Sequence, residues 1–150
     1  MKRATIGMFA VAILAMATVA FAQKPDFSGT WTLDPEASGM AAGGGRGMGA
    51  GPMTVKQTAD TLTTETTRGE NKVTMTYKLD GTESTNTGMG RGGAQTESKS
   101  TVKWDGAKLV ITTKAGENES TQTWSIDGGN LVIEGTGGRG PTKRIYKKTT

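Results

Sequence analysis

The chain has 150 residues, of which 33% are hydrophobic, and a formal net charge of +4. It contains no cysteine and no histidine, which excludes a disulfide-stapled fold, the common nucleophile–base pairs and the commonest metal ligand. Removal of Lys2 and Arg3 with a leader would lower the charge to +2, which is too little to indicate a nucleic acid partner.

Residues 1–22 have the organisation of a secretory signal peptide. A basic start, Met1–Arg3, precedes an apolar run over 6–20, and Ala20-Phe21-Ala22 has the small-x-small pattern that signal peptidase reads. The apolar run is short for a helix that spans a membrane. We therefore expect residues 1–22 to be removed and 23–150 to form one domain. The mature protein is expected to be periplasmic or secreted, with no stable membrane insertion.

The first predicted strand covers 27–34, in which residues of alternating character place Gly29 and Trp31 on one face. A loose lead-in, 23–26, is expected before it. After it, 38–52 is so rich in glycine that a helix would lose too much backbone entropy. We expect a loop there.

From residue 53 onward the chain is a series of short, threonine-rich alternating segments, which is typical of strands. Asp-Gly, a strong hairpin signal, occurs three times. A second Gly-rich loop is expected over 87–93. Successive hairpins without intervening helices predict an all-β, up-and-down antiparallel β-barrel of about 8–10 strands, with an open β-sandwich as the alternative. The further predicted strands are 53–59, 61–68, 72–79, 96–104, 109–113, 120–126, 131–134 and 142–148.

Several predicted inward positions are polar, among them Thr64, Ser100 and Gln122. An interior of this kind suits a ligand cavity better than a solid core.

Gly29-x-Trp31 on the opening strand and Arg144-x-Tyr146 on the last one resemble the signature of the lipocalins and their fatty-acid-binding relatives, the calycin barrels. With the segments over 103–113, the chain is similar to uncharacterised exported bacterial proteins of this lipocalin-like type. The resemblance implies a barrel that binds small apolar or amphipathic molecules, and it implies no enzymatic activity.

The resemblance leaves two roles open for Arg144. In fatty-acid-binding proteins an Arg-x-Tyr pair holds the ligand carboxylate, whereas in other calycins the arginine lies across the tryptophan of the first strand. A third possibility follows from alternation, because an inward Ile145 would turn Arg144 outward. The helical lid of fatty-acid-binding proteins is missing here. The implied ligand-binding residues are Arg144, Tyr146, Tyr77, Trp104 and Trp124, and the structural signature is Gly29 and Trp31.

Three Gly-rich loops carry an arginine, namely Arg46, Arg91 and Arg139. They could be cationic tips for anions, lipid headgroups or single strands, or simply solubilising loops. Counting the predicted strands places the second and third loops at one end of the barrel and the first at the other. One shared site is therefore not expected.

The sequence offers no catalytic constellation, because its aspartates coincide with turns and no twelve-residue calcium loop is present. We expect no enzyme activity, no metal and no cofactor. The predicted function is that of a monomer that binds a small apolar or amphipathic, lipid-like ligand. The alternative is an envelope interaction or stress-protection protein with a filled barrel, which acts through its Gly/Arg-rich loops.

Overall fold

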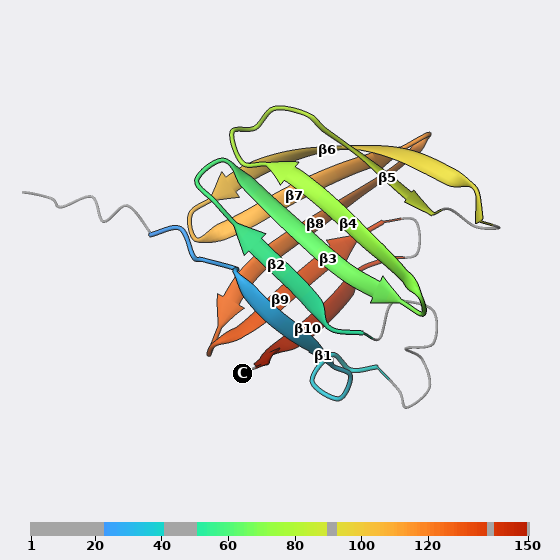
Figure 1. Cartoon of the computed structure of the whole chain (residues 1–150). Helices are drawn as coiled ribbons and strands as arrows, with labels where there is room; N and C mark the ends of the chain where they lie inside the picture. The colour runs from blue at the N-terminus through green and yellow to red at the C-terminus, as the bar shows by residue number, and fades with distance from the viewer. Residues whose placement is uncertain (1–22, 41–50, 90–92, 138–139, 150) are drawn as a thin grey trace, which may run out of the picture.

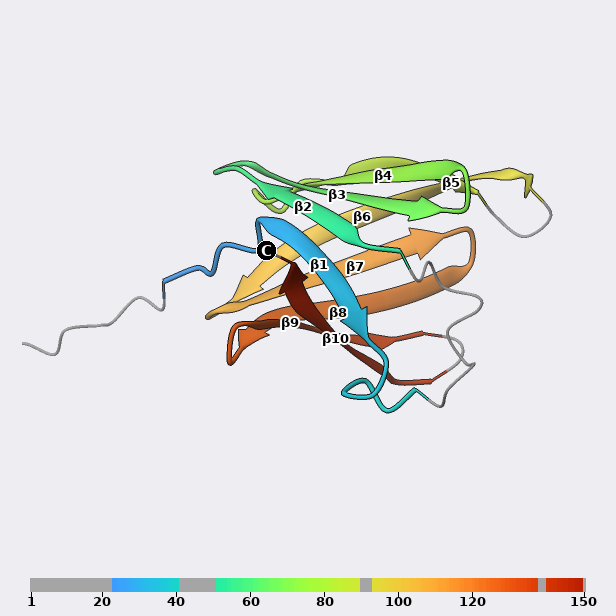
Figure 2. The ribbon, with the colours of Figure 1, turned by 60° about the horizontal axis from the view of Figure 1, so that its bottom comes forward.

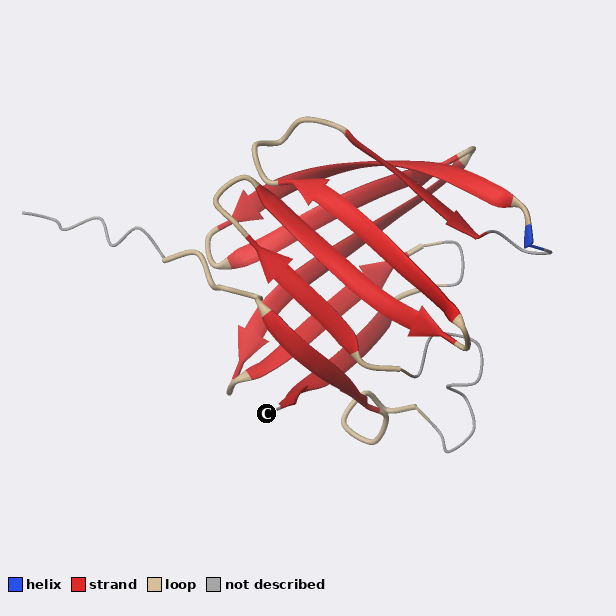
Figure 3. Ribbon diagram, in the orientation of Figure 1, coloured by secondary structure: helices blue, strands red, loops and turns tan. Residues whose placement is uncertain are grey.

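The computed structural model describes residues 23–40, 51–89, 93–137 and 140–149. The predicted signal peptide and the three loop arginines, Arg46, Arg91 and Arg139, lie outside these residues. No helix in the described ranges is long and apolar enough to cross a membrane. Figures 1 and 3 show that strands form the wall of the molecule. They are β1 (Gly29–Asp34), β2 (Met53–Gln57), β3 (Thr61–Arg68), β4 (Asn71–Lys78), β5 (Ser84–Met89), β6 (Gln95–Asp105), β7 (Lys108–Ala115), β8 (Asn118–Asp127), β9 (Asn130–Thr136) and β10 (Thr142–Thr149).

The strands form one antiparallel sheet in the order β4-β3-β2-β1-β10-β9-β8-β7-β6-β5. Almost every strand pairs with its neighbours in sequence, and β1 pairs with β10, so the chain is an up-and-down meander that curls into a barrel (Figure 1). The predicted barrel is confirmed, and the alternative of an open sandwich is wrong. The two ends of the sheet, β4 and β5, meet at a seam.

Strand β5 is the element that the sequence analysis missed, because the loop expected over 87–93 begins inside it. Because strands alternate in direction, the additional strand reverses the direction that the sequence analysis had given to every strand after it. Strands β1, β5 and β9, which end at Asp34, Met89 and Thr136, therefore finish at the same end of the barrel (Figure 2). We call this the loop end. The prediction that the first Gly-rich segment starts at the opposite end from the other two is wrong.

Residues directly opposite each other in antiparallel strands share a face of the sheet, so the registers define an inward face. Thr64 and Ser100 are buried on it, and Gln122 lies opposite Ile111 and Gly135 on the same face. The predicted inward polar positions are confirmed. The buried hydrophobic cluster on this face comprises Phe27, Trp31, Met53, Val55, Leu62, Tyr77, Val102, Leu109, Ile111, Trp124, Leu131, Ile133 and Tyr146.

Aromatic side chains fill the end of the barrel opposite the loop end. Phe27 stacks on Trp104, with ring centroids 6.3 Å apart, and meets Trp124 edge to face at 5.8 Å. The indole N–H of Trp31 donates to the carbonyl of Phe27 (2.9 Å). Phe27 is wholly buried. We call this the aromatic end, and it closes the barrel with a solid floor.

A single glutamine ties the N-terminal segment across that floor. The backbone N–H of Phe27 donates to Gln57 Oε1 (3.0 Å), and Gln57 Nε2 donates to the carbonyl of Pro25 (3.1 Å). The expectation of a loose lead-in over 23–26 is therefore wrong for Pro25. A primary amide carries both a donor and an acceptor, which lets Gln57 pair with the chain as a strand residue would.

Candidate ligand-binding site

The four predicted aromatic site residues come from alternate strands, β4, β6, β8 and β10, and all join or pack against the buried cluster. Tyr77, Trp124 and Tyr146 keep only 7%, 3% and 8% of their surface exposed. These three rings are buried within the hydrophobic cluster, and we count them with the floor. Burial raises the pKa of Tyr77 to about 12, which keeps its hydroxyl neutral. Their contact with a ligand stays a prediction.

The orientation of Arg144 follows from its neighbours on β10. Tyr146 belongs to the buried cluster, and residues two apart on a strand share a face. Arg144 also lies opposite Ile133, another member of the cluster. Arg144 is thus an inward residue, and its side chain is half-buried. Ile145 occupies the outward position opposite Val132.

A cation does lie over the ring of Trp31, but it belongs to Lys148, whose Nζ is 5.5 Å from the ring centroid. The register places Lys148 directly opposite Trp31, one inward position beyond Tyr146. Gly29 makes this contact possible. A Cβ at Gly29 would lie 2.8 Å from Lys148 Cε, and its φ of 138° is one that side chains rarely adopt. Gly29 therefore leaves room for Lys148, which covers the ring of Trp31. Arg144 does not cover this ring.

Inward residues nearer the loop end differ from the floor because they are half-buried and mostly polar. Three of them make side-chain hydrogen bonds, and Met75 Sδ accepts from the hydroxyl of Tyr77 (3.3 Å). Thr113 Oγ1 pairs with Ser100 Oγ (2.8 Å), and Gln122 Oε1 accepts from the indole N–H of Trp124 (3.2 Å). From the accessible, half-buried part of the inward face we select six residues, Leu33, Thr66, Met75, Thr113, Gln122 and Arg144, and call them the inner wall.

Charge is distributed unequally between the two faces of the barrel wall. The five ion pairs of the described residues all use lysine, and those on the strands lie at outward positions. No Asp or Glu occupies an inward strand position in the described ranges, as the registers show. The Arg144 guanidinium therefore faces an interior strand surface without a carboxylate. Within the same ranges, no group of three or more acidic side chains could hold a metal ion.

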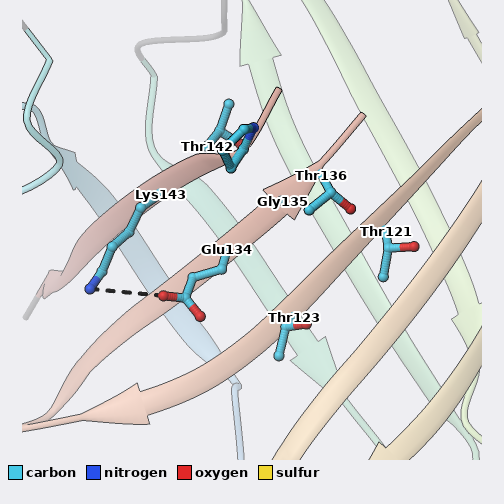
Figure 4. Close-up of a pocket in the computed structure, with 8 residues that line it drawn as sticks. Thr121, Thr123, Glu134, Gly135, Thr136, Thr142 and Lys143 are labelled. Carbon is cyan, nitrogen blue, oxygen red and sulfur yellow. Dashed lines mark ion pairs between the residues drawn. The ribbon is translucent and has the colours of Figure 1, made fainter. Parts of the chain in front are cut away.

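A hollow of about 410 Å³, which we call the outer hollow, lies near the loop end and is lined mainly by outward residues of β8, β9 and β10. Lys143 and Glu134 reach toward each other there from β10 and β9, with Nζ and Oε1 3.9 Å apart (Figure 4). Its other lining residues include outward threonines from β8 and β9. Gly135 and Thr142, which occupy inward register positions, also line it at this edge of the sheet. Its lining residues are Thr121, Thr123, Glu134, Gly135, Thr136, Pro141, Thr142 and Lys143.

No family model matches the sequence, and the comparison with curated proteins gives no match. Solved structures do match. The chain superposes on the fatty acid transporter REP1-NXSQ with a TM-score of 0.63 and 20% identity, covering 82% of this chain and 96% of the other. Human cRBP IV gives 0.59 and 23%, covering 83% and 99%. A heat-soluble (SAHS) protein from Ramazzottius varieornatus gives 0.58 and 17%, covering 82% and 95%. The fold is that of the fatty-acid-binding and lipocalin-like calycin barrels.

Sequence reasoning missed the role of Lys148, although the signal was present. Arg144, Tyr146 and Lys148 are spaced by two along one strand, so Arg144 and Lys148 must both lie on the same face as Tyr146. Which cation reaches Trp31 depends on the register between β1 and β10, and alternation within one strand carries no information about that register.

Proposed function

We propose that this protein is a non-catalytic carrier that binds a small amphipathic anion at its inner wall, and that the mature chain acts in the periplasm or outside the cell. The observation that carries the proposal is the inward, half-buried Arg144 on a face where the described strands place no carboxylate. A guanidinium in such surroundings favours a carboxylate, which it can hold with two parallel hydrogen bonds.

The rest of the inner wall sets the size and character of this ligand. Leu33 and Met75 offer apolar surface, whereas Thr113 and Gln122 offer hydrogen-bonding groups. Buried aromatic rings occupy the aromatic end, which favours a ligand that does not extend far past Tyr146. A ligand with a carboxylate head and a short apolar body fits these constraints. The name of one structural match, a fatty acid transporter, agrees with a carboxylate ligand.

Mass spectrometry of a solvent extract of the purified mature protein identifies any ligand that the protein carries. The residue assignment is then tested with decanoate and decanol, which differ only in the head group. Arg144→Gln should weaken decanoate binding by about tenfold or more, the effect of losing a charge-assisted pair. Decanol binding should not change.

Lys143→Gln is the matched control. It removes the same charge from the neighbouring residue, but that residue points outward and pairs with Glu134. Decanoate binding should survive this change. Equal losses in the two variants would show that only the overall charge matters, and the proposed site would then be wrong.

The filled aromatic end supports a second candidate, a stress-protection protein whose barrel holds no ligand. The name of the SAHS match points the same way. An empty extract together with no binding of either probe would favour this second function.

A further inference from the structure

Hydroxyl groups form a continuous row on one side of the barrel interior. Across the adjacent strands β5 to β8, the registers place an inward serine or threonine directly opposite the next one. We call this the hydroxyl row, and it consists of Ser84, Ser100, Thr113 and Ser120. Ser84 and Ser100 are buried, whereas Thr113 and Ser120 are half-buried. The accessible part of the row is therefore the pair Thr113 and Ser120.

This pair lies near the loop end, at a depth similar to that of Arg144. Thr113 on β7, Ser120 on β8 and Arg144 on β10 are each the third residue from the loop end of their strand. Gly137 leaves the pair uncovered. A Cβ at Gly137 would lie 3.4 Å from Ser120 Cβ, so a side chain at this position would lie over the serine. A ligand that is held at Arg144 and enters from the loop end therefore meets these two hydroxyls.

Burial decides which proton of the hydroxyl row is free. Ser100 Oγ and Thr113 Oγ1 are 2.8 Å apart, and one of the two hydroxyls donates to the other. A buried donor without an acceptor is costly. Because Ser100 is only 1% exposed, it is the donor, and the proton of Thr113 is left for a further acceptor. Ser120 lies directly opposite Thr113, with Cβ atoms about 5 Å apart, so one ligand hydroxyl can bridge the two side chains.

The other side of the interior offers apolar surface. Strands β1 to β4 lie across the interior from β7 and β8 (Figures 1 and 2). On them, Leu33 and Met75 are half-buried and pack against the hydrophobic cluster. A ligand in this space thus has an apolar side and a hydrogen-bonding side. A plain hydrocarbon body would cover the hydroxyls of Thr113 and Ser120 without bonding to them, which costs free energy.

The strand order also indicates how far a hydroxyl of the ligand lies from its carboxylate. Arg144 is on β10 and Thr113 is on β7, and β9 and β8 lie between these strands. Three strand spacings amount to about 14 Å along the wall. The side chains shorten this span but do not close it. A hydroxyl beside the carboxylate would therefore not reach Thr113, whereas one several carbons away would.

We propose that the ligand is an aliphatic acid with a hydroxyl group near the far end of its chain, which Thr113 and Ser120 bind while Arg144 holds the carboxylate. This inference rests on the proposed function, because it assigns a second polar group to the same ligand. The hydroxyl of Thr113 donates to the ligand oxygen, and the ligand hydroxyl donates to Ser120 Oγ. Leu33 and Met75 contact the carbon chain between the two polar groups.

Isothermal titration calorimetry with decanoate, 2-hydroxydecanoate and 10-hydroxydecanoate tests this assignment. The wild type should bind 10-hydroxydecanoate about threefold to tenfold more tightly than decanoate, the effect of added hydrogen bonds. It should show no such preference for 2-hydroxydecanoate. Thr113→Val keeps the branched shape of the side chain and should bring the ratio of the affinities for 10-hydroxydecanoate and decanoate close to one. Ser120→Ala should lower the same ratio. A general loss of affinity cancels in this ratio.

Thr112→Val is the matched control. It makes the same change at the next residue, which is also half-buried but faces outward, and the ratio should keep its wild-type value. If the wild type binds decanoate and 10-hydroxydecanoate equally well, the hydroxyl assignment is overturned while the proposed function stands. The same conclusion follows if the preference survives both Thr113→Val and Ser120→Ala, or if Thr112→Val abolishes it equally. If the wild type binds none of the three acids, both proposals are overturned.

Discussion

Phe27→Ala should be among the most damaging single substitutions in this protein. Phe27 lies outside the first strand, yet it is wholly buried and contacts two tryptophans of the floor. Truncation of a buried phenylalanine lowers the free energy of unfolding by about 3–5 kcal/mol, which includes the cavity that it leaves. We expect about 4 kcal/mol here, which corresponds to a fall in Tm of about 15 °C for a domain of this size.

Guanidinium chloride unfolding measures this loss, and tryptophan fluorescence reports it directly because Trp104 and Trp124 contact the substituted ring. Leu33→Ala is the control. Leu33 is also apolar and packs against the cluster, but it is half-buried at the inner wall. Its loss should be about 1–2 kcal/mol, because less apolar area returns to water. A loss below about 1 kcal/mol for Phe27→Ala, or one equal to that of the control, would refute the argument that the floor is solid.

Three further predictions concern charge. Lys148→Met keeps the apolar stem and removes the cation over Trp31, so stability should fall by about 0.5–1 kcal/mol in a denaturant titration; a loss near zero would contradict the contact. Hydrogen bonding to Lys147 and to a backbone N–H holds the pKa of Asp34 below its usual value of 3.8. The wild type should therefore lose stability as pH falls through that depressed pKa, and Asp34→Asn should lose less of it over the same range; parallel acid titrations would contradict this. Burial raises the pKa of Tyr77 to about 12, so its contribution to stability is present below the unfolded-state value and disappears as pH rises toward 12. Absorbance titration should show one late tyrosine that is absent from Tyr77→Phe, and two tyrosines with ordinary values would contradict the burial.

The architecture was predictable from the sequence because most strands have one buried face. Alternation in segments such as 72–79 reports that burial directly, and the Asp-Gly turns mark where strands end. Strand β5 escaped for the opposite reason. Its inward residues, Ser84, Asn86 and Gly88, line the β4–β5 seam rather than the hydrophobic core. Neither face of β5 is therefore apolar, and the strand shows no alternation of apolar and polar residues. Because this strand was missed, the sequence analysis assigned the Gly-rich segments to the wrong ends of the barrel.

The candidate site was predictable only in part. Spacing placed Arg144 and Tyr146 on one face, but only the partner strands show that this face is the inward one. The aromatic residues are inward as expected, and packing against Phe27 turns them into a floor. That packing depends on the tie between Gln57 and the N-terminal segment. Phe27 and Gln57 are 30 positions apart in the chain, so their hydrogen bond leaves no local pattern in the sequence.

Chemical-shift mapping by NMR tests the central claim most directly, because the inner-wall residues and the threonines of the outer hollow lie on opposite faces of the sheet. In a titration with decanoate, we expect the largest shifts at the inner-wall residues Thr113, Gln122 and Arg144. The outward residues Thr121 and Thr123 should shift little. Shifts concentrated at those two threonines would place the ligand in the outer hollow and contradict the account, as would a titration that changes no inner-wall signal.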